Sequence, residues 1–261
     1  MVTRLRRRSS RSARWSLRLS RFAIPVFILT IIFHQFGMIG AKTMLILFGI
    51  IWIGATVAII LGVVGLLTIW SFGLDGARRA LLGIVLSLPL LAIPLYFTWL
   101  TLLYPQMNDI STNLSEPPVF IQLSGIRPSD ANPIVTRYGP EEALVQGEAY
   151  SDIRPLYLGS SIEDTYSAVL AVVGDMGWQI IVEEPANDGD SPARVQAVAK
   201  TLIAGFSDDV IILIMPDQGD TRVDMRSVSR YGRHDFGTNA NRIKTFLIAL
   251  QEEVSPTLGD P

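Results

Sequence analysis

Three long apolar stretches dominate the first half of the chain. They cover residues 22–40, 44–71 and 80–103. About 20 apolar residues in a helix are enough to cross a hydrocarbon core of about 30 Å. The pattern therefore predicts a region of three membrane-spanning helices over residues 22–103.

Beyond residue 154 the apolar positions recur at the shorter spacings of a small mixed domain. Helical spacing follows the capping residues Ser160 and Ser161 and returns near 239–254. Between these helices, alternating or β-branched runs predict four strands, at 178–183, 194–200, 209–215 and 221–230. The expected fold class is three N-terminal transmembrane α-helices plus a C-terminal α+β domain, an antiparallel sheet of about four strands with two helices on one face.

The segment between these two regions is rich in proline and polar residues and only weakly periodic. Such a segment should be extended and docked rather than an independent fold. The expected organisation is a basic cytoplasmic tail (1–21), a three-span region (22–103), an extended linker or docking segment (104–153), an exported α+β domain (154–254) and a disordered tail (255–261).

The net charge of −2 conceals three differently charged regions. Residues 1–21 carry +8, residues 22–103 carry +2 and residues 104–261 carry −12. With a mean hydropathy of +0.36, this distribution excludes a single soluble globule and a nucleic-acid-binding domain with a basic patch. By the positive-inside rule, the N-terminus lies in the cytoplasm and the acidic domain lies outside the inner membrane, in the periplasm of a Gram-negative cell.

Two features of the spans leave alternatives open. A cleaved signal peptide would need a shorter basic region and a small-residue cleavage site, so an uncleaved anchor is favoured. His34 and Gln35, in the first span, are either functional groups or neutral partners of a neighbouring helix; if they disqualified this span, the domain would be cytoplasmic. Gly54, Ala58 and Gly62 predict a close helix contact.

Absent residue types exclude several chemistries. The chain has no cysteine and only two histidines, so no disulfide, thiol nucleophile or multi-histidine metal site is expected. A phosphate-binding loop and a dinucleotide fingerprint are also missing from the sequence. We therefore expect no cofactor and no metal, with the lipid bilayer and a membrane or envelope protein as partners.

Several motifs resemble a bacterial family known as the domain of unknown function 1499. They are Asn108 to Thr112, Pro117 to Phe120, Gly205 to Val210, Val223 to Arg230, Gly232 to Asp235, Gly237, Asn239-Ala240 and Arg242-Ile243. The resemblance covers about residues 104–254 and departs from the family at Ser151, where a proline is expected. It implies a domain that often follows membrane spans, but no reaction.

Arginines crowd one stretch of the otherwise acidic domain. The candidate ligands of an anion are Arg226, Arg230, Arg233, Asn239 and Arg242, near glycine turns that lead into a helix. Guanidinium groups and helix N-termini bind phosphate or carboxylate. The competing interpretation is that the arginines pair with Asp208, Asp209 and Asp224 and brace the sheet against the last helix.

Two functions remain from this pattern. The favoured one is a membrane-anchored envelope protein whose non-catalytic exported domain binds an anionic ligand or partner. The alternative is an envelope hydrolase that acts on a lipid or cell-wall substrate through residues 226–242, with Ser229, His234 and Asp235 as acid–base groups. Neighbouring histidine and aspartate seldom face each other, and no nucleophile-elbow motif is present. A weaker third hypothesis is an accessory subunit that docks through Gly54, Ala58 and Gly62.

Overall fold

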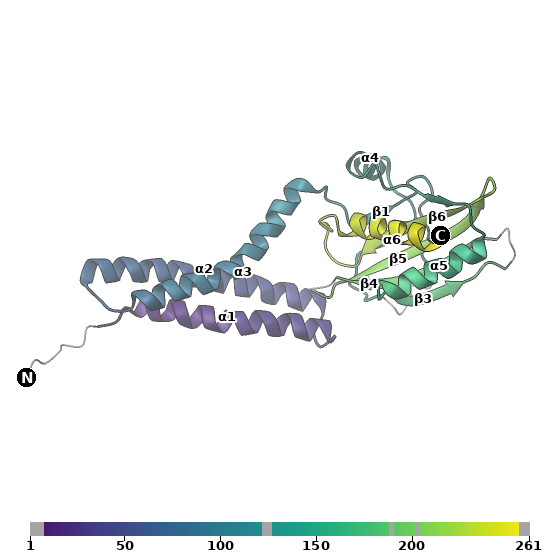
Figure 1. Cartoon of the computed structure of the whole chain (residues 1–261). Helices are drawn as coiled ribbons and strands as arrows, with labels where there is room; N and C mark the ends of the chain where they lie inside the picture. Colours follow the sequence, from purple (N-terminus) through teal and green to yellow (C-terminus); the bar gives the residue numbers. More distant parts are fainter. Residues whose placement is uncertain (1–7, 122–126, 188–190, 202–203, 256–261) are drawn as a thin grey trace, which may run out of the picture. The chain divides into compact units, whose positions relative to one another are not determined.

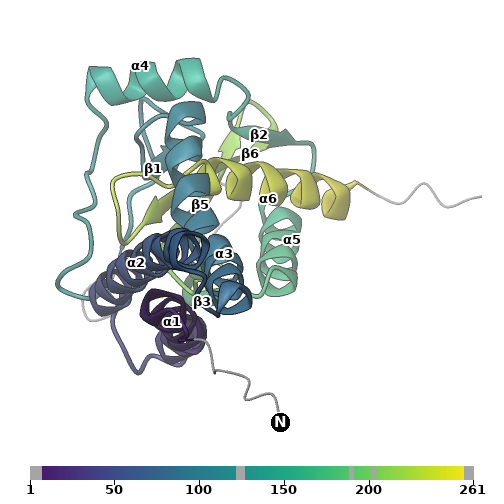
Figure 2. The ribbon, with the colours of Figure 1, turned by 90° about the vertical axis from the view of Figure 1, so that its left-hand side faces the viewer.

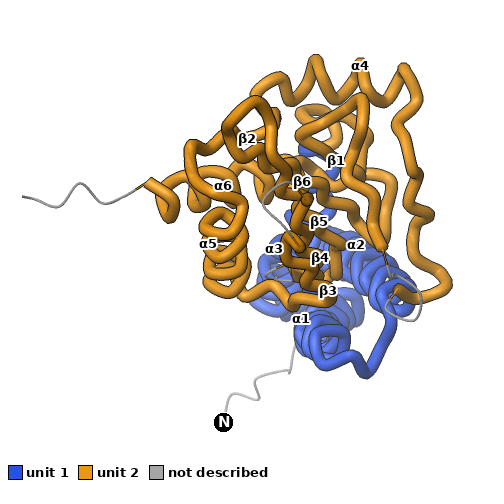
Figure 3. The backbone as a smooth tube through the Cα atoms, turned by 90° about the vertical axis from the view of Figure 1, so that its right-hand side faces the viewer, with its two compact units in different colours: residues 1–100, 203–205 blue, residues 101–202, 206–261 orange. Residues whose placement is uncertain are grey.

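The structure is a computed structural model that describes residues 8–121, 127–187, 191–201 and 204–255. The chain divides into two compact units, residues 1–100 with 203–205 and residues 101–202 with 206–261 (Figure 3). The boundary falls near the end of the third helix. Apart from Ser255, the expected tail 255–261 falls outside the described residues.

The first unit consists of three long helices, α1 (Arg11–Gln35), α2 (Ala41–Phe72) and α3 (Ala77–Leu103) (Figure 1). All three are long and apolar enough to cross a membrane. The helix α1 starts eleven residues before the first predicted span and ends five residues earlier than it. The Ser10 hydroxyl caps the start by accepting a hydrogen bond from the Ala13 N–H, and such a cap stabilises a helix start.

Small and hydroxylated residues form the helix contacts of this unit. Ser16 donates a hydrogen bond of 2.7 Å to the Ala58 carbonyl of α2, and Ser20 donates one of 2.7 Å to the Gly83 carbonyl of α3. Such contacts require a close approach of the backbones, which small residues allow. Of the three residues predicted to form a packing face, Ala58 and Gly62 are buried here, whereas a Cβ at Gly54 would meet no atom within 4 Å.

The two ends of this unit have distinct polar contacts. The N–H of Ser10 donates to the carbonyl of Asp75, in the α2–α3 loop, at 2.9 Å. The start of α1 and the second loop therefore lie at the same end of the helices. At the other end, the Nδ1 atom of His34 lies 3.0 Å from the Ile39 carbonyl, within the α1–α2 turn. This contact ties His34 to the turn.

The second unit contains an antiparallel sheet in the order β1-β6-β5-β4-β3, with β2 also paired to β6. Its elements are β1 (Asp109–Ser111), α4 (Pro140–Ala149), β2 (Leu156–Leu158), α5 (Ile162–Asp175), β3 (Gln179–Glu184), β4 (Ala193–Lys200), β5 (Ser207–Asp217), β6 (Asp220–Ser229) and α6 (Thr238–Val254). The predicted fold class, three apolar helices and then an α+β domain, is confirmed.

The sheet has six strands rather than about four. The two additional strands, β1 and β2, have three residues each, too few to display an alternation of apolar and polar positions. They pair with successive parts of the same edge of β6, β2 with residues 221–223 and β1 with residues 226–228. These two segments become strands because they pair with β6, so their own sequences do not predict them.

Helices α5 and α6 lie side by side on one face of the sheet (Figures 1 and 2). The core between them and the sheet contains Val172 and Phe246 from the helices and Ile212 and Met225 from the strands. The rings of Trp178 and Phe246 stack with centroids 5.7 Å apart. Because side chains alternate along a strand, the residues on either side of Met225 in β6 face the other side of the sheet.

That second face is covered by the chain between β1 and α4. The Gln196 side chain on β4 exchanges two hydrogen bonds with the Ile121 backbone. Asn132 donates its backbone N–H to the Arg230 carbonyl at 2.7 Å. The amide of Gln146, on α4, bonds to both backbone groups of Ser111. The proline-rich segment therefore has specific polar contacts with the sheet.

Candidate functional site

The most buried arginine of the domain is Arg226 on β6, whose exposed fraction is 0%. It forms a two-point ion pair with Asp109 on β1, with Nε–Oδ1 and Nη2–Oδ2 distances of 2.9 and 2.6 Å. The guanidinium also donates to the carbonyls of Pro118 and Val135, at 3.2 and 2.8 Å. Every nitrogen of this side chain therefore has an acceptor.

Two aromatic rings enclose the same guanidinium. Its central carbon lies 5.7 Å from the centroid of Phe120 and 5.2 Å from that of Tyr138, within the range of a cation–π contact. The Tyr138 hydroxyl donates to Asp109 Oδ1 at 2.6 Å. Burial alone would lower the pKa of Arg226, but the hydrogen bonds and charge of Asp109 outweigh it and the pKa is raised. Arg226 is therefore a permanent cation inside the fold.

A second arginine on the same face of β6, Arg230, pairs with Asp209 of β5. Its Nη2 and Nε atoms lie 2.6 and 3.0 Å from Asp209 Oδ1. Arg127 reaches the other oxygen of this carboxylate, with Nε 2.9 Å from Oδ2. Both arginine side chains are at least 88% buried, because their exposed fractions are 7% and 12%. One carboxylate thus serves two guanidinium groups.

The Arg127 side chain is incompletely satisfied. Its Nε and Nη2 atoms are buried and make no hydrogen bond with acceptable geometry. Burial lowers its pKa and Arg230 lowers it further, whereas Asp209 opposes both effects. Unsatisfied buried donors are rare in proteins, and each one needs a physical explanation.

A third network joins β5 and β6 to the start of α6. Arg242 donates to Asp208 at 2.5 Å, to Ser227 at 2.8 Å and to the Asn239 side-chain oxygen at 2.5 Å. The Asn239 amide donates in turn to the Ser229 hydroxyl at 2.9 Å. Burial raises the pKa of Asp208, partly offset by Arg242 and Ser229.

Asp235 caps α6. Its carboxylate accepts hydrogen bonds from the backbone N–H groups of Gly237 and Asn239, at 3.1 and 2.8 Å. A carboxylate at this position accepts hydrogen bonds from free N–H groups and interacts favourably with the positive end of the helix dipole. Burial nevertheless raises the pKa of Asp235 above its usual range. The predicted anion position at the helix start is thus filled by a side chain of the protein itself.

The three residues considered for hydrolysis do not form a catalytic arrangement. Nε2 of His234 lies 3.1 Å from the Tyr104 carbonyl, and Nδ1 accepts the Phe236 N–H at 3.0 Å. The Ser229 hydroxyl is engaged by Asn239, and both oxygens of Asp235 bind backbone N–H groups. A nucleophile and base must reach each other, and here each side chain has a different partner.

The structure separates the predicted anion ligands into two groups. Arg226, Arg230, Asn239 and Arg242 are buried or nearly so and have partners within the protein, whereas Arg233 is exposed. The competing interpretation is confirmed for three arginines, since Arg222 pairs with Asp224 at 2.6 Å, Arg230 with Asp209 and Arg242 with Asp208. The pairs of Arg230 and Arg242 connect β5 to the end of β6 and to α6, whereas Arg222 and Asp224 lie on the same strand.

Sequence reasoning missed three members of these networks: Asp109, Arg127 and Tyr138. All three belong to the segment 104–153, which has no clear periodicity. The available signal was the presence of single charged and aromatic residues among the prolines, together with Asp109 inside a family motif. Which arginine each would meet depends on how the segment crosses the sheet, and this is a tertiary property.

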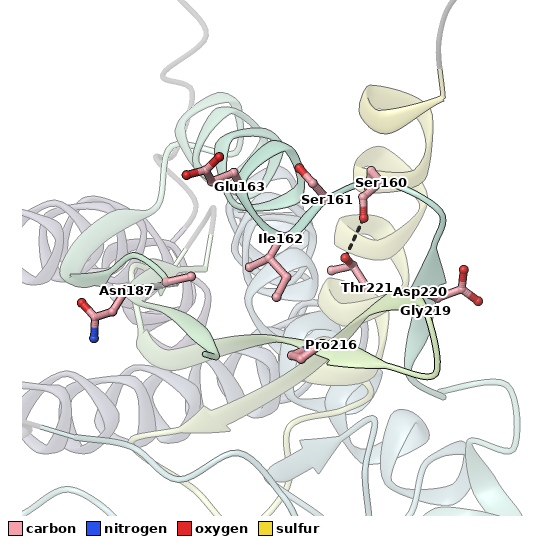
Figure 4. A pocket seen from close by; sticks show the side chains of 10 residues that line it. Ser160, Ser161, Ile162, Glu163, Asn187, Pro216, Gly219, Asp220 and Thr221 are labelled. Carbon is pink, nitrogen blue, oxygen red and sulfur yellow. Dashed lines mark hydrogen bonds between the residues drawn. The ribbon is translucent and has the colours of Figure 1, made fainter. Parts of the chain in front are cut away.

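Two hollows of the domain are lined by residues other than the predicted anion ligands. One of about 350 Å³ is lined by the start of α5 and the β5–β6 turn, where the Thr221 hydroxyl donates to the Ser160 carbonyl (Figure 4). Another, of about 410 Å³, lies beside Tyr150 and Arg154. Within the described residues, no three His, Asp or Glu side chains are grouped to hold a metal ion.

These features define a multi-pass membrane protein with three apolar helices and an α+β domain whose sheet carries buried arginine–aspartate pairs. A family model described as "Protein of unknown function (DUF1499)" matches residues 109–250. The match spans more than half of the chain, which therefore belongs to this family. A search of the curated proteins finds no significant match.

Proposed function

We propose that this chain is a membrane-anchored protein of the bacterial cell envelope whose exported domain is a non-catalytic module that binds an anionic ligand or partner. Its eight N-terminal arginines favour a cytoplasmic N-terminus in the inner membrane. The pairing of Ser10 with Asp75 keeps the α2–α3 loop, and with it Arg78 and Arg79 in the first turn of α3, at that same end. Three spans then direct the domain to the periplasm.

The observation that carries the binding proposal is the sharing of Asp209 by Arg127 and Arg230. Two guanidinium groups therefore converge on one carboxylate. Nε of Arg127 faces this carboxylate, whereas its buried Nη2 atom has no hydrogen-bond partner among the described residues and remains available as a donor. A guanidinium edge of this kind matches a phosphate or carboxylate group in geometry and charge.

The surroundings of this cluster support an anion rather than a cation as the ligand. Three guanidinium groups, those of Arg127, Arg226 and Arg230, lie against the two carboxylates of Asp109 and Asp209. Arg233, which is exposed, lies three residues beyond Arg230 in the chain. Nucleic acid is not an expected partner, because the domain as a whole is acidic.

Calorimetric titration of the full chain in nanodiscs of neutral phosphatidylcholine tests this proposal, with inorganic phosphate as the probe. The wild type should bind phosphate at low ionic strength. Arg127→Gln should weaken binding by about tenfold or more, as expected for the loss of one charged hydrogen-bonding partner. Arg137→Gln removes an exposed arginine from the same segment and should change the affinity by less than about twofold.

Two outcomes contradict the proposal. One is a wild-type chain that binds neither phosphate nor acetate, and the other is an equal loss of affinity in both variants. Melting curves of both variants, followed by circular dichroism, establish that the domain is folded in each. Arg127→Lys keeps the charge but loses the planar pair of donors, so retention of part of the affinity indicates a purely electrostatic contact.

A further inference from the structure

The first half of α1 has a stripe of arginines along its exposed face. Arg11, Arg14, Arg18 and Arg21 follow one another at spacings of three, four and three residues, which places them on one side of a helix. Two exposed aromatic residues, Trp15 and Phe22, lie on the same side. We call these six residues the arginine stripe.

The opposite face of the same half-helix is buried in the helix contacts. Ala13, Ser16 and Ser20 are each 0% exposed. Ser16 reaches the Ala58 carbonyl and Ser20 reaches the Gly83 carbonyl. These contacts fix the rotation of α1 about its axis, so the arginine stripe is directed away from α2 and α3.

The same contacts also fix the depth of the arginine stripe. Ser20 lies between Arg18 and Arg21, and its partner Gly83 is already within the apolar part of α3. Around this level, α2 and α3 expose Ile60 and Val85, each with an exposed fraction of 56%. Cationic groups and lipid-facing apolar side chains thus occur at one level of the unit.

The unit contains almost no acidic residue to balance these arginines. Asp75 is the only carboxylate among the first 108 residues, and it lies in the loop beyond the start of α1. Charged groups near the hydrocarbon boundary are stable when their long side chains reach the headgroups and pair with phosphate. The counter-ion must therefore come from outside this unit.

We propose that the arginine stripe is a binding surface for anionic phospholipid, with Arg14, Arg18 and Arg21 on the headgroup phosphate and the acyl chains against the exposed apolar residues of α2 and α3. The Arg18 guanidinium lies 5.3 Å from the centroid of the Trp15 ring. This stacking holds the cation at the depth where indole side chains reside, the membrane interface. Charge complementarity and the amphipathic surroundings identify a lipid as the ligand.

This surface differs from the general excess of positive charge on the cytoplasmic side. A general excess attracts anionic lipid in proportion to charge, wherever the charges lie. The arginine stripe instead holds its cations on one face and at a defined depth. Removing two charges from the arginine stripe should reduce the lipid preference more than removing two charges from the first turn of α3 at the same end, where Arg78 and Arg79 are also exposed.

Electron paramagnetic resonance of spin-labelled lipids tests this distinction on the full chain in phosphatidylcholine bilayers. The immobilised fraction of spin-labelled phosphatidylglycerol, relative to that of spin-labelled phosphatidylcholine, gives the selectivity of the protein for the anionic lipid. The wild type should prefer phosphatidylglycerol, and high salt should weaken this preference. Arg14→Gln with Arg18→Gln should remove most of the preference, and Arg78→Gln with Arg79→Gln should remove less than half of it.

Three results overturn the proposal. The first is a wild type without preference for phosphatidylglycerol, and this result does not depend on whether the variants fold. Equal losses in the two double variants assign the preference to bulk charge. Abolition of the preference by inorganic phosphate, at an ionic strength where the same concentration of chloride does not abolish it, assigns the arginines to a free anion rather than to a lipid. The arginine stripe lies in a different unit from Arg127, so its failure leaves the proposed phosphate binding of the domain testable.

Discussion

Arg226 and Asp109 join the middle of β6 to β1 through two hydrogen bonds of 2.9 and 2.6 Å, in a place where the arginine has no exposure to solvent. These residues are 117 positions apart in the sequence. Their contact holds the segment after the membrane helices on the sheet, because Asp109 comes only six residues after the end of α3. The pair therefore holds β1, at the start of the second unit, on β6.

Asp109→Asn should destabilise the domain strongly. It leaves the Arg226 cation buried without its counter-charge, a change that costs about 3–5 kcal/mol in comparable buried pairs. The unfolding of the domain can be followed in the full chain by urea titration with the fluorescence of Trp178, the only tryptophan beyond residue 100, after replacement of the other four.

The matched control is Asp152→Asn, which removes the partner of Lys244 from an exposed ion pair of similar length, 2.6 Å. Exposed pairs contribute no more than about 1 kcal/mol. If Asp109→Asn lowers the free energy of unfolding no more than Asp152→Asn does, the buried pair does not stabilise the domain as predicted. The double variant Asp109→Leu/Arg226→Met should recover much of the stability, because it removes both charges together.

The ring and the hydroxyl of Tyr138 should contribute separately. Tyr138→Phe removes the 2.6 Å hydrogen bond to Asp109, and a bond to a charged acceptor is worth about 1.5–3 kcal/mol. Tyr138→Leu also removes the ring that faces the Arg226 guanidinium, which adds a cation–π loss of about 1 kcal/mol or more. Urea midpoints should therefore decrease in the order wild type, Phe variant, Leu variant. A Phe variant that equals the Leu variant shows that the ring contributes nothing.

The periodic elements of this protein were predictable because their signals are local. The spacing of Ile243, Phe246 and Leu250 predicts a buried helix face, and these residues do form the core under α6. The alternation along β6 likewise places Val223 and Met225 towards the helices. Long apolar helices are equally visible, since hydropathy alone identifies them.

The partners of the buried charges were only partly predictable. Asp209 lies on β5 and Arg230 directly follows β6, which a short turn joins to β5, so their proximity follows from the strand assignment. Arg226 instead contacts Asp109 and Tyr138, which belong to a segment without periodicity. No sequence pattern predicts where that segment crosses the sheet. The convergence of Arg127 and Arg230 on Asp209 was not predictable for the same reason, because Arg127 belongs to that segment.

Asp235 should make the stability of the domain depend on pH in a defined direction. Burial raises its pKa in the folded protein above its ordinary value, so the folded state binds this proton more tightly than the unfolded state does. The contribution of Asp235 is then greatest below the ordinary aspartate pKa of about 3.9 and decreases as the pH rises through the raised value.

Urea unfolding of wild type and Asp235→Asn between mildly acidic and neutral pH measures this contribution as a difference. The other carboxylates are common to both proteins, so their titration largely cancels. The stability of the wild type relative to the variant should decrease as the pH rises. A difference that grows with pH instead means that the N–H groups of Gly237 and Asn239 stabilise the carboxylate form more than burial opposes it.

In the membrane unit, Gly83→Ala should disrupt the contact between α1 and α3. A Cβ at this position would lie 2.1 Å from the Ser16 hydroxyl and 2.9 Å from the backbone nitrogen of Leu17, and backbone atoms cannot move aside as a flexible side chain can. Gly54→Ala is the matched control, because a Cβ there meets no atom within 4 Å. Thermal unfolding in detergent should show a lower midpoint for Gly83→Ala and no decrease for Gly54→Ala, since alanine favours a helix over glycine by about 1 kcal/mol. Equal midpoints for the two variants would contradict the close approach of α1 and α3, and they would also remove the contact that directs the arginine stripe outward.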